Sequence, residues 1–452
     1  MYIVIIGAGE VGLHIAGFLS QEGQKVALID RDPERLAWAA EKVDALAVMG
    51  NGASKRVMTE ASVKQAEIVV AVTDSDEVNM IACMAAKRVG VPLTIARIRN
   101  SDYLDSPESV SSEFIGIDYV IQPDNAVAQE VGRLAGYPGA LEVETFASGQ
   151  GLMLEVRVAA DSKWAGKTIA EMDLSRDVLV CGILSGPSMR VPRGDTVLEP
   201  DTRVFLAGRP AAVQETAGIL SLDTRVAKTA ILLGCGHLGL PIAKTLEAKG
   251  IRLIAFENDS EKALEAASTL SKSLVLHHEG LAEEVLLANG VDDVDLFIAA
   301  TGNDSLNLLA SLQAKRLGAR RTLAIQDRGE FSEILEASGV DVAIRPRRLT
   351  ASAVMRHLRA GKVMSATLLD KSAGEVLEFL IPEGSPIVGV PLRDCDFPEG
   401  SILGVLKRGE GVEVARGDTV PRAGDIAVVF AATEAVAAVE KLFTARRFRS
   451  RR

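Results

Sequence analysis

Two glycine-rich hexapeptides are the residues of this chain whose types and spacing could bind a ligand. The first reads Gly7-Ala8-Gly9-Glu10-Val11-Gly12, and the second reads Gly234-Cys235-Gly236-His237-Leu238-Gly239. In such a motif the first glycine permits a tight turn, the second lets a pyrophosphate approach the backbone amides, and the third lets helix and strand pack closely. Each half of the chain is therefore predicted to bind the phosphates of a nucleotide. The alternative is a βαβ turn kept for packing alone.

An acidic residue follows each glycine motif at the same spacing. Asp30 and Glu257 each end a second apolar run. A carboxylate at this place accepts hydrogen bonds from the ribose hydroxyls, and it would repel a 2′-phosphate. The two acids therefore favour ligands with free ribose hydroxyls, among which the sequence does not separate NAD, NADH, ATP and ADP.

Two further loops are expected to face the same ligand in the first half, and one arginine could contact it. Asn51 follows the third apolar run, Thr73 and Asp74 follow the fourth, and Arg97 follows the run Leu93–Ala96. The carboxyl ends of parallel strands share one edge of a sheet, and ligands bind there. Arg97 could contact a phosphate or the adenine, although a surface arginine in a salt bridge is an equally good interpretation.

These motifs belong to a repeat that spans the chain. Each motif follows a short apolar run, Ile3–Ile6 or Ala230–Leu233, and precedes a helix-like stretch. Downstream, Val70–Thr73 matches Ile298–Thr301. Strands that alternate with helices in this way predict two α/β units, each a Rossmann-like, doubly wound parallel sheet.

A smaller β-rich unit follows each Rossmann-like unit. Its short alternating runs include Leu154–Val158, and the turn Arg193–Val197 recurs as Arg416–Val420. Helices are expected at Ala211–Leu220 and Glu434–Phe443. The predicted boundaries are 1–137 and 228–361 for the Rossmann-like domains, 140–223 and 364–444 for the small α+β domains, and 445–452 for a basic tail. That tail could touch anionic lipid, but a solvated tail is more common.

The composition excludes several classes of protein. The 452 residues carry a formal net charge of −11, which disfavours nucleic-acid binding along the whole chain. Charges interrupt every apolar stretch before the roughly 20 residues that span a bilayer, and the first strand runs straight into Gly7 without a leader pattern. The four cysteines lie far apart, which fits a reducing cytoplasm.

The sequence suggests neither a metal site nor a catalytic cluster. His277-His278-Glu279 lacks an evident third ligand, and the remaining histidines have no acid–base partner. We therefore expect no metal, no catalytic residue and no enzyme.

The two halves differ where phosphates would bind. Arg97 aligns with Ile325, and the loop that holds Asn51 aligns with His278-Glu279-Gly280. The first site is therefore predicted to be the stronger one, unless Arg328 supplies the missing charge of the second.

Two Rossmann-like units and two small β-rich units occur together with the first glycine motif, Asp30, the stretch Ala71–Met80 and Ala96-Arg97-Ile98-Arg99. In these features the chain resembles the TrkA family over its whole length. The resemblance implies four domains, an RCK (regulator of potassium conductance) N-terminal Rossmann domain and an RCK C-terminal domain in each half. It also implies a cytoplasmic homo-oligomer, dimer or tetramer, at the inner face of the membrane, docked on a Trk channel subunit and regulated by NAD(H) or ATP/ADP.

The resemblance carries the family's ligand contacts onto particular residues. They are Gly7, Ala8, Gly9, Glu10, Val11, Asp30, Asn51, Thr73, Asp74 and Arg97 in the first half, and Gly234, Cys235, Gly236, His237, Leu238, Glu257 and Thr301 in the second. The alternative function is a soluble NAD-dependent oxidoreductase, which only the glycine motif favours. A third interpretation, the ligand-binding tail of a fused transporter, lacks a spanning segment.

Overall fold

The structure, a computed structural model, describes residues 1–21, 23–104, 116–185, 188–327, 338–358, 364–369 and 374–444. Three features of the sequence analysis lie outside these residues. They are the basic tail, the expected domain boundary near Gly361 and the side chain of Arg328. The chain divides into two compact units, Met1–Gln129 with Ala230–Leu358 and Glu130–Thr229 with Arg359–Arg452. The Rossmann-like parts of both halves therefore lie in the first unit, and the β-rich parts of both halves lie in the second. The four domain boundaries above remain a prediction.

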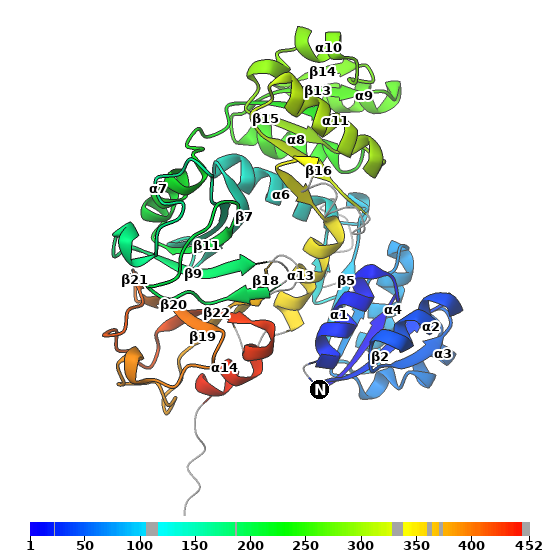
Figure 1. Ribbon diagram of the computed structural model, residues 1–452. Coiled ribbons are helices and arrows are strands. Elements are labelled where there is room, and N and C mark those ends of the chain that lie inside the picture. Colours follow the sequence, from blue (N-terminus) through cyan, green and yellow to red (C-terminus); the bar gives the residue numbers. More distant parts are fainter. Residues whose placement is uncertain are drawn as a thin grey trace, which may run out of the picture. The chain divides into compact units, whose positions relative to one another are not determined.

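The first Rossmann lobe is a parallel sheet in the order β3-β2-β1-β4-β5-β6, flanked by helices (Figure 1). The order reverses between β1 and β4, which is where doubly wound sheets bind ligands. The elements are β1 (Tyr2–Ile6), α1 (Glu10–Gln21), β2 (Lys25–Asp30), α2 (Pro33–Lys42), β3 (Leu46–Met49), α3 (Lys55–Glu60), β4 (Ile68–Ala71), α4 (Asp76–Arg88), β5 (Leu93–Arg97), β6 (Tyr119–Ile121) and α6 (Pro123–Gly136).

The second Rossmann lobe repeats this order as β14-β13-β12-β15-β16-β17, with parallel pairing. The elements are β12 (Thr229–Leu233), α8 (Gly239–Ala248), β13 (Arg252–Glu257), α9 (Ser260–Thr269), β14 (Leu274–His277), α10 (Glu283–Ala288), β15 (Leu296–Ala299), α11 (Asp304–Leu317), β16 (Thr322–Ile325), β17 (Val342–Ile344) and α13 (Pro346–Leu358). Two doubly wound sheets were predicted from the repeat, and the structure confirms them.

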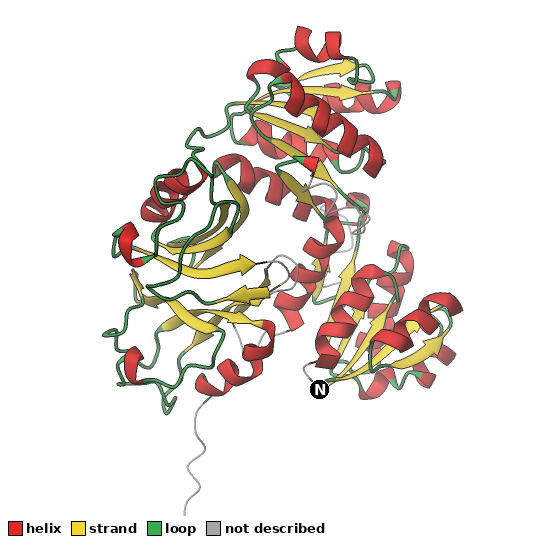
Figure 2. Ribbon diagram, in the orientation of Figure 1, coloured by secondary structure: helices red, strands yellow, loops and turns green. Residues whose placement is uncertain are grey.

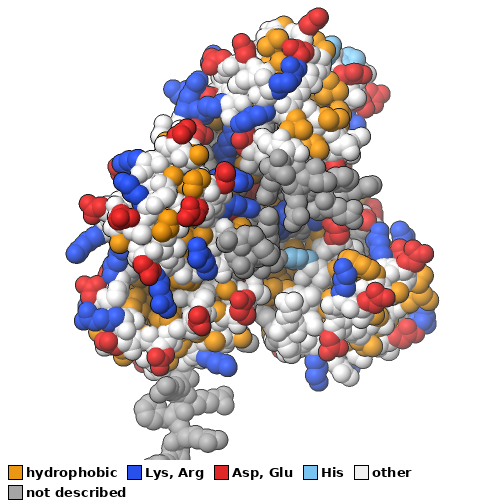
Figure 3. Space-filling view, viewed as in Figure 1, with side chains coloured by type: hydrophobic (Ala, Val, Ile, Leu, Met, Phe, Trp, Pro, Cys, Tyr) orange, Lys and Arg blue, Asp and Glu red, His pale blue; other side chains and the backbone are white. Residues whose placement is uncertain are grey.

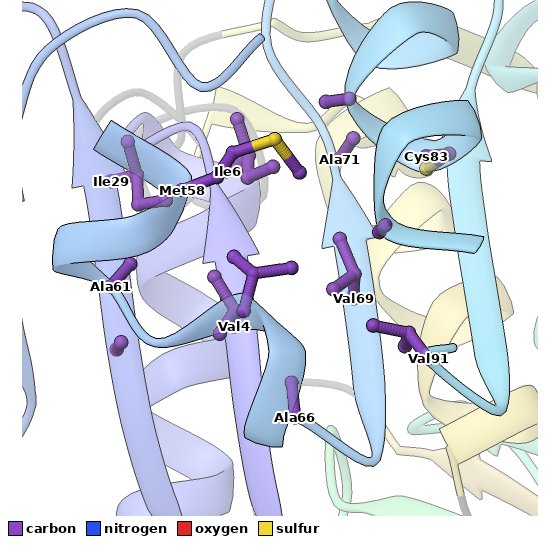
Figure 4. Close-up of a cluster of buried hydrophobic side chains, with 14 of the residues drawn as sticks. Val4, Ile6, Ile29, Met58, Ala61, Ala66, Val69, Ala71, Cys83 and Val91 are labelled. Carbon is purple, nitrogen blue, oxygen red and sulfur yellow. The ribbon is translucent and has the colours of Figure 1, made fainter. Parts of the chain in front are cut away.

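The apolar strands of the first lobe are buried on both faces of the sheet, as parallel strands usually are. Figure 4 shows Val4 and Ile6 of β1 and Val69 of β4 beside Met58 of α3. None of these four side chains is more than 7% exposed. Burying one such side chain contributes about 1.5–3 kcal/mol. The core thus holds rigid the strand ends from which the site loops emerge.

The second unit consists of two antiparallel sheets, so strands dominate it in Figure 2. The first sheet has the order β10-β9-β11-β8-β7, and the second has the order β18-β19-β22-β20-β21. Buried side chains of both sheets, Phe205 and Phe430 among them, form one shared core. The elements are β7 (Ala140–Phe146), β8 (Gly151–Arg157), β9 (Val178–Ser185), β10 (Ser188–Arg190), β11 (Arg203–Gly208), α7 (Pro210–Ser221), β18 (Ser365–Leu368), β19 (Gly374–Leu380), β20 (Ser401–Arg408), β21 (Gly411–Val414), β22 (Ile426–Ala432) and α14 (Val436–Leu442).

The repeated turn of the small domains has one geometry in both halves. The hydroxyl oxygen of Thr196 accepts a hydrogen bond of 2.9 Å from the amide of Arg193, and that of Thr419 accepts one of 3.1 Å from Arg416. The last helix is shorter than expected, because residues Thr433–Ala435 form a 3-10 turn before α14 begins. On the face in Figure 3, acidic and basic side chains are interspersed over the described residues.

Candidate functional site

A cavity of about 1010 Å³ lies at the carboxyl ends of the strands of the first lobe. Its volume is at the upper end of the range typical of small-molecule sites, about 300–1,000 Å³. The structure brings all ten residues predicted for the first half to its wall. They are Gly7, Ala8, Gly9, Glu10, Val11, Asp30, Asn51, Thr73, Asp74 and Arg97.

The glycine loop between β1 and α1 uses its three glycines for a tight turn, for an open backbone and for close packing of the helix. Gly7 has φ of +110°, a conformation that side chains rarely adopt. A Cβ on Gly12 would lie 1.8 Å from the carbonyl oxygen of Gly7, so the loop closes tightly on the helix. At Gly9 the nearest atom to an added Cβ is Arg35 Nη1, at 3.9 Å. The backbone at Gly9 is therefore open to a ligand.

Asp30 at the end of β2 is buried and holds the glycine loop. Its Oδ2 accepts a hydrogen bond of 2.6 Å from the amide of Ala8, and its Oδ1 accepts one of 2.9 Å from the amide of Asp32. Each carboxylate oxygen has further lone pairs to offer. The acid can therefore brace the loop and still accept ribose hydroxyls, a double role that the spacing alone did not reveal.

The loop after β3 also depends on Asp30. The amide of Gly50 donates to the carbonyl oxygen of Asp30 at 2.8 Å, and Asn51 Oδ1 accepts from the amide of Ala53 at 2.9 Å. The Asn51 side chain thus organises its own turn beside the cavity.

Asn79 of α4 is a buried organiser whose role the sequence analysis missed. Its Oδ1 accepts from the amide and hydroxyl of Thr73, at 2.9 and 2.7 Å, and its Nδ2 donates to the carbonyl oxygen of Arg97 at 2.8 Å. It therefore ties the loop after β4 to the end of β5. The second lobe repeats these bonds among Asn307, Thr301 and Ile325. The recurrence of both asparagines in the repeat was the available signal.

Arg97 places a buried cation against the cavity. Its side chain is 7% exposed, and Nη1 donates to the carbonyl oxygen of Thr73 at 3.0 Å and to Asp74 at 3.3 Å. Its Nε has no hydrogen-bond partner. Burial and the charge of Arg99 lower the pKa of Arg97, and Asp74 partly offsets this. Arg97 is therefore not the exposed salt-bridge arginine of the alternative interpretation, and it is suited to an anionic ligand.

Four more arginines that the sequence analysis did not assign to the site line the cavity. Arg31 follows β2, Arg35 comes from α2, Arg99 follows β5, and Arg347 comes from α13 of the second lobe. Trp38 of α2, 47% exposed, adds an aromatic face. Carboxylates line the cavity as well, among them Asp30, Asp32 and Asp74, so the arginines offer local sites for anionic groups and not a uniformly positive surface.

The second lobe has the same loop geometry. Gly234 has φ of +94°, and a Cβ on Gly239 would lie 1.9 Å from the carbonyl oxygen of Gly234. Glu257 Oε2 accepts a hydrogen bond of 2.7 Å from the amide of Cys235. Burial and the charge of Glu257 raise the pKa of Cys235 to about 12, so the thiol stays protonated.

The second lobe differs from the first at the phosphate-facing positions. Ile325, 2% exposed, ends β16 where Arg97 ends β5. In the loop after β14, His278 Nδ1 accepts from the amide of Gly280 at 3.0 Å, and His277 Nε2 lies 3.1 Å from the carbonyl oxygen of Asn258. These histidines are engaged in the local structure of the loop.

Two domain families match the chain, each of them twice. The TrkA-N domain matches residues 3–123 and 230–346, which are the two Rossmann lobes. The TrkA-C domain matches residues 153–221 and 376–444, which hold most strands of the two antiparallel sheets. No helix among the described residues has the length and apolarity to cross a bilayer.

Proteins of known name resemble the chain over nearly its full length. The Trk system potassium uptake protein TrkA of Azorhizobium caulinodans is 36% identical, over 98% of both chains. A TrkA homolog of Archaeoglobus fulgidus is also 36% identical, over 98% of this chain and all of the relative. Among solved structures, the RCK domain of GsuK has a TM-score of 0.59 at 16% identity, over 98% of this chain and 94% of the other. A GsuK channel bound to NAD also has a TM-score of 0.59, at 17% identity, over 98% and 78%.

Proposed function

Because the chain belongs to the TrkA family, we propose that it is a regulatory subunit of potassium uptake that binds a nucleotide in the cavity of its first lobe. Its relatives are named for potassium uptake and not for a reaction, and the chain is not an enzyme. The oxidoreductase alternative is therefore set aside. The partner we propose is a membrane channel subunit of the Trk type, on the cytoplasmic side of the membrane, with the chain as a homo-oligomer.

The choice of ligand rests on one observation. Asp30, the glycine loop and Arg97 all line the same cavity. The loop offers backbone amides at a helix N-terminus to phosphates, and Arg97 offers a cation. The buried carboxylate of Asp30 suits ribose hydroxyls and opposes a 2′-phosphate. NAD(H), ADP and ATP meet these requirements, and a channel of similar fold has been solved with NAD.

Regulation requires that the ligand bind two states of the assembly unequally. Couplings of this kind are typically about 1–3 kcal/mol. Binding of the nucleotide at the first lobe would shift the assembly between such states, and the channel subunit would respond to the shift.

Calorimetric titration of the full chain tests the ligand class. We expect saturable binding of NAD(H), ADP or ATP, and weaker binding of NADP, since Asp30 would face its 2′-phosphate. A chain that binds none of these nucleotides, or that prefers NADP, would contradict the proposal.

A further inference from the structure

Arg347 belongs to the second lobe but lies in the cavity of the first. Helix α13, on which it sits, packs against α1 within the same compact unit (Figure 1). Its guanidinium lies 2.7 Å from Glu10 Oε1 and donates to the two carboxylate oxygens of Asp327, at 2.8 and 3.2 Å. Arg347 therefore bridges an acid of the first lobe and an acid of the second.

The position of Glu10 brings Arg347 close to where phosphates would bind. Glu10 is the first residue of α1, directly after the open backbone of Gly9. Arg347 shares this cavity with Arg97, whose Nε is buried without a partner. The two guanidinium groups come from different lobes and line one space. Both can bind phosphate oxygens through several N–H groups.

The equivalent positions of the other lobe carry different residues. In the repeat, Glu10 corresponds to His237 and Arg347 corresponds to Asp124. Asp124 at the start of α6 interacts electrostatically with His237 of the second lobe and with Arg99 of its own. Asp327, which holds Arg347, corresponds to Arg99. Each lobe thus reaches toward the glycine motif of the other, but the second lobe brings a cation and the first brings an anion.

We propose that Arg347 is a phosphate ligand of the nucleotide at the first site, so that the second lobe completes this site. The inference rests on the proposed function and names a specificity residue for it. Without nucleotide Arg347 is paired with Glu10 and Asp327. A nucleotide phosphate offers a competing anion at the same helix end, and Arg347 exchanges Glu10 for it. Ligands with two or three phosphates gain this contact, and adenosine does not.

The exchange also links ligand binding to the contact between the lobes. Arg347 is bonded to Asp327 in the loop after β16 of its own lobe, so its movement toward the phosphate acts on α13. The bond to Glu10 that it gives up is a bond between the lobes. Binding of a nucleotide at the first site is thereby coupled to the packing of α13 against α1.

Titration of the full-length Arg347→Gln variant with adenosine, ADP and ATP tests the proposal. We expect the Kd for ADP and ATP to rise about tenfold, the lower end for one charge-assisted contact, and the Kd for adenosine to change less than about twofold. Arg356→Gln is the matched control, because Arg356 is exposed in the last turn of the same helix. We expect it to bind like the wild type.

Glu10→Gln separates a ligand role from a purely structural one. This variant breaks the same bond between the lobes but frees Arg347, so we expect tighter binding of ADP, opposite in sign to Arg347→Gln. The proposal is overturned if Arg347→Gln binds ADP like the wild type, if it loses adenosine equally, or if both variants weaken ADP binding alike. If the wild type binds no nucleotide at all, the proposed function fails instead.

Discussion

The carboxylate of Asp30 lies 2.6 Å from the amide of Ala8, so the acid that ends β2 is bonded directly to the glycine loop. The bond joins the two parts of the proposed site that would hold the ribose and the phosphates. The second lobe repeats it between Glu257 and Cys235 at 2.7 Å. The acid and the loop therefore act as one unit in both lobes.

Asp30→Ala should weaken nucleotide binding at the first site at least tenfold without unfolding the protein. The variant loses the acceptor for the ribose hydroxyls and the brace of the loop, and a hydrogen bond to a charged group contributes about 1.5–3 kcal/mol. Calorimetric titration with NADH and ADP measures the change. Glu257→Ala, the matched change in the second lobe, should leave binding at the first site intact. Equal isotherms for wild type and Asp30→Ala would refute the assignment of Asp30.

Gly12→Ala should destabilise the first lobe. The added Cβ would overlap the carbonyl oxygen of Gly7 at 1.8 Å, and backbone must move to relieve it. A cost of about 1–3 kcal/mol is expected for such overpacking. Gly17→Ala in the same helix is the control, because its Cβ would meet only Val43 Cγ2 at 3.8 Å. Thermal unfolding should show a lower Tm for Gly12→Ala and an equal or higher one for Gly17→Ala. A wild-type Tm for Gly12→Ala would contradict the loop geometry.

The two sites should differ in affinity, with the first the stronger. Arg97→Ile gives the first lobe the residue that the second lobe has at Ile325, and it should raise the Kd for ADP about tenfold or more. The experiment needs the full chain, because α13 of one half packs against α1 of the other. Titration of the Glu257→Ala chain reports on the first site, and titration of the Asp30→Ala chain reports on the second. Equal affinities in both would show that the exchange of Arg97 for Ile325 has no functional weight.

Stability should fall as the pH drops below 6.5, in part because of His14 on α1. Burial and the charges of Arg348 and Arg345 lower the pKa of His14 from its ordinary value of 6.5. The pKa of this histidine is lower in the folded chain than in the unfolded chain, so the unfolded chain binds the proton more readily. The free energy of unfolding therefore falls as the pH drops from 6.5 to the folded pKa. Tm measured against pH should decline less steeply for His14→Gln. Identical slopes for the two proteins would exclude this role.

The repeat made most of the fold predictable from sequence. Apolar runs that are buried on both faces read as parallel strands, and the glycine motifs mark the turns where a Cβ would clash, as at Gly12. All ten site residues expected in the first half line one cavity, because strand ends that follow one another in a doubly wound sheet meet at one edge.

What sequence reasoning missed depends on contacts between distant segments. Arg347 reaches the first site only because α13 packs on the other lobe. The spacing of residues along the sequence near Arg347 does not indicate this packing. Asn79 recurs as Asn307 in the repeat, but that recurrence alone does not show that the side chain is buried and bonded to Thr73. The hydrogen bond that the Ala8 amide donates to Asp30 likewise depends on how the glycine loop lies beside the end of β2.

Potassium flux is the most direct test of a nucleotide-regulated subunit. Vesicles that hold a Trk-type membrane subunit would receive the purified chain, with and without NADH, ADP or ATP, and flux would be measured beside nicotinamide absorbance. We predict that nucleotide changes the flux in the presence of the wild-type chain, that Asp30→Ala reduces this response, and that no cofactor is consumed. A flux indifferent to chain and nucleotide, with substrate-dependent oxidation of NADH, would contradict the account.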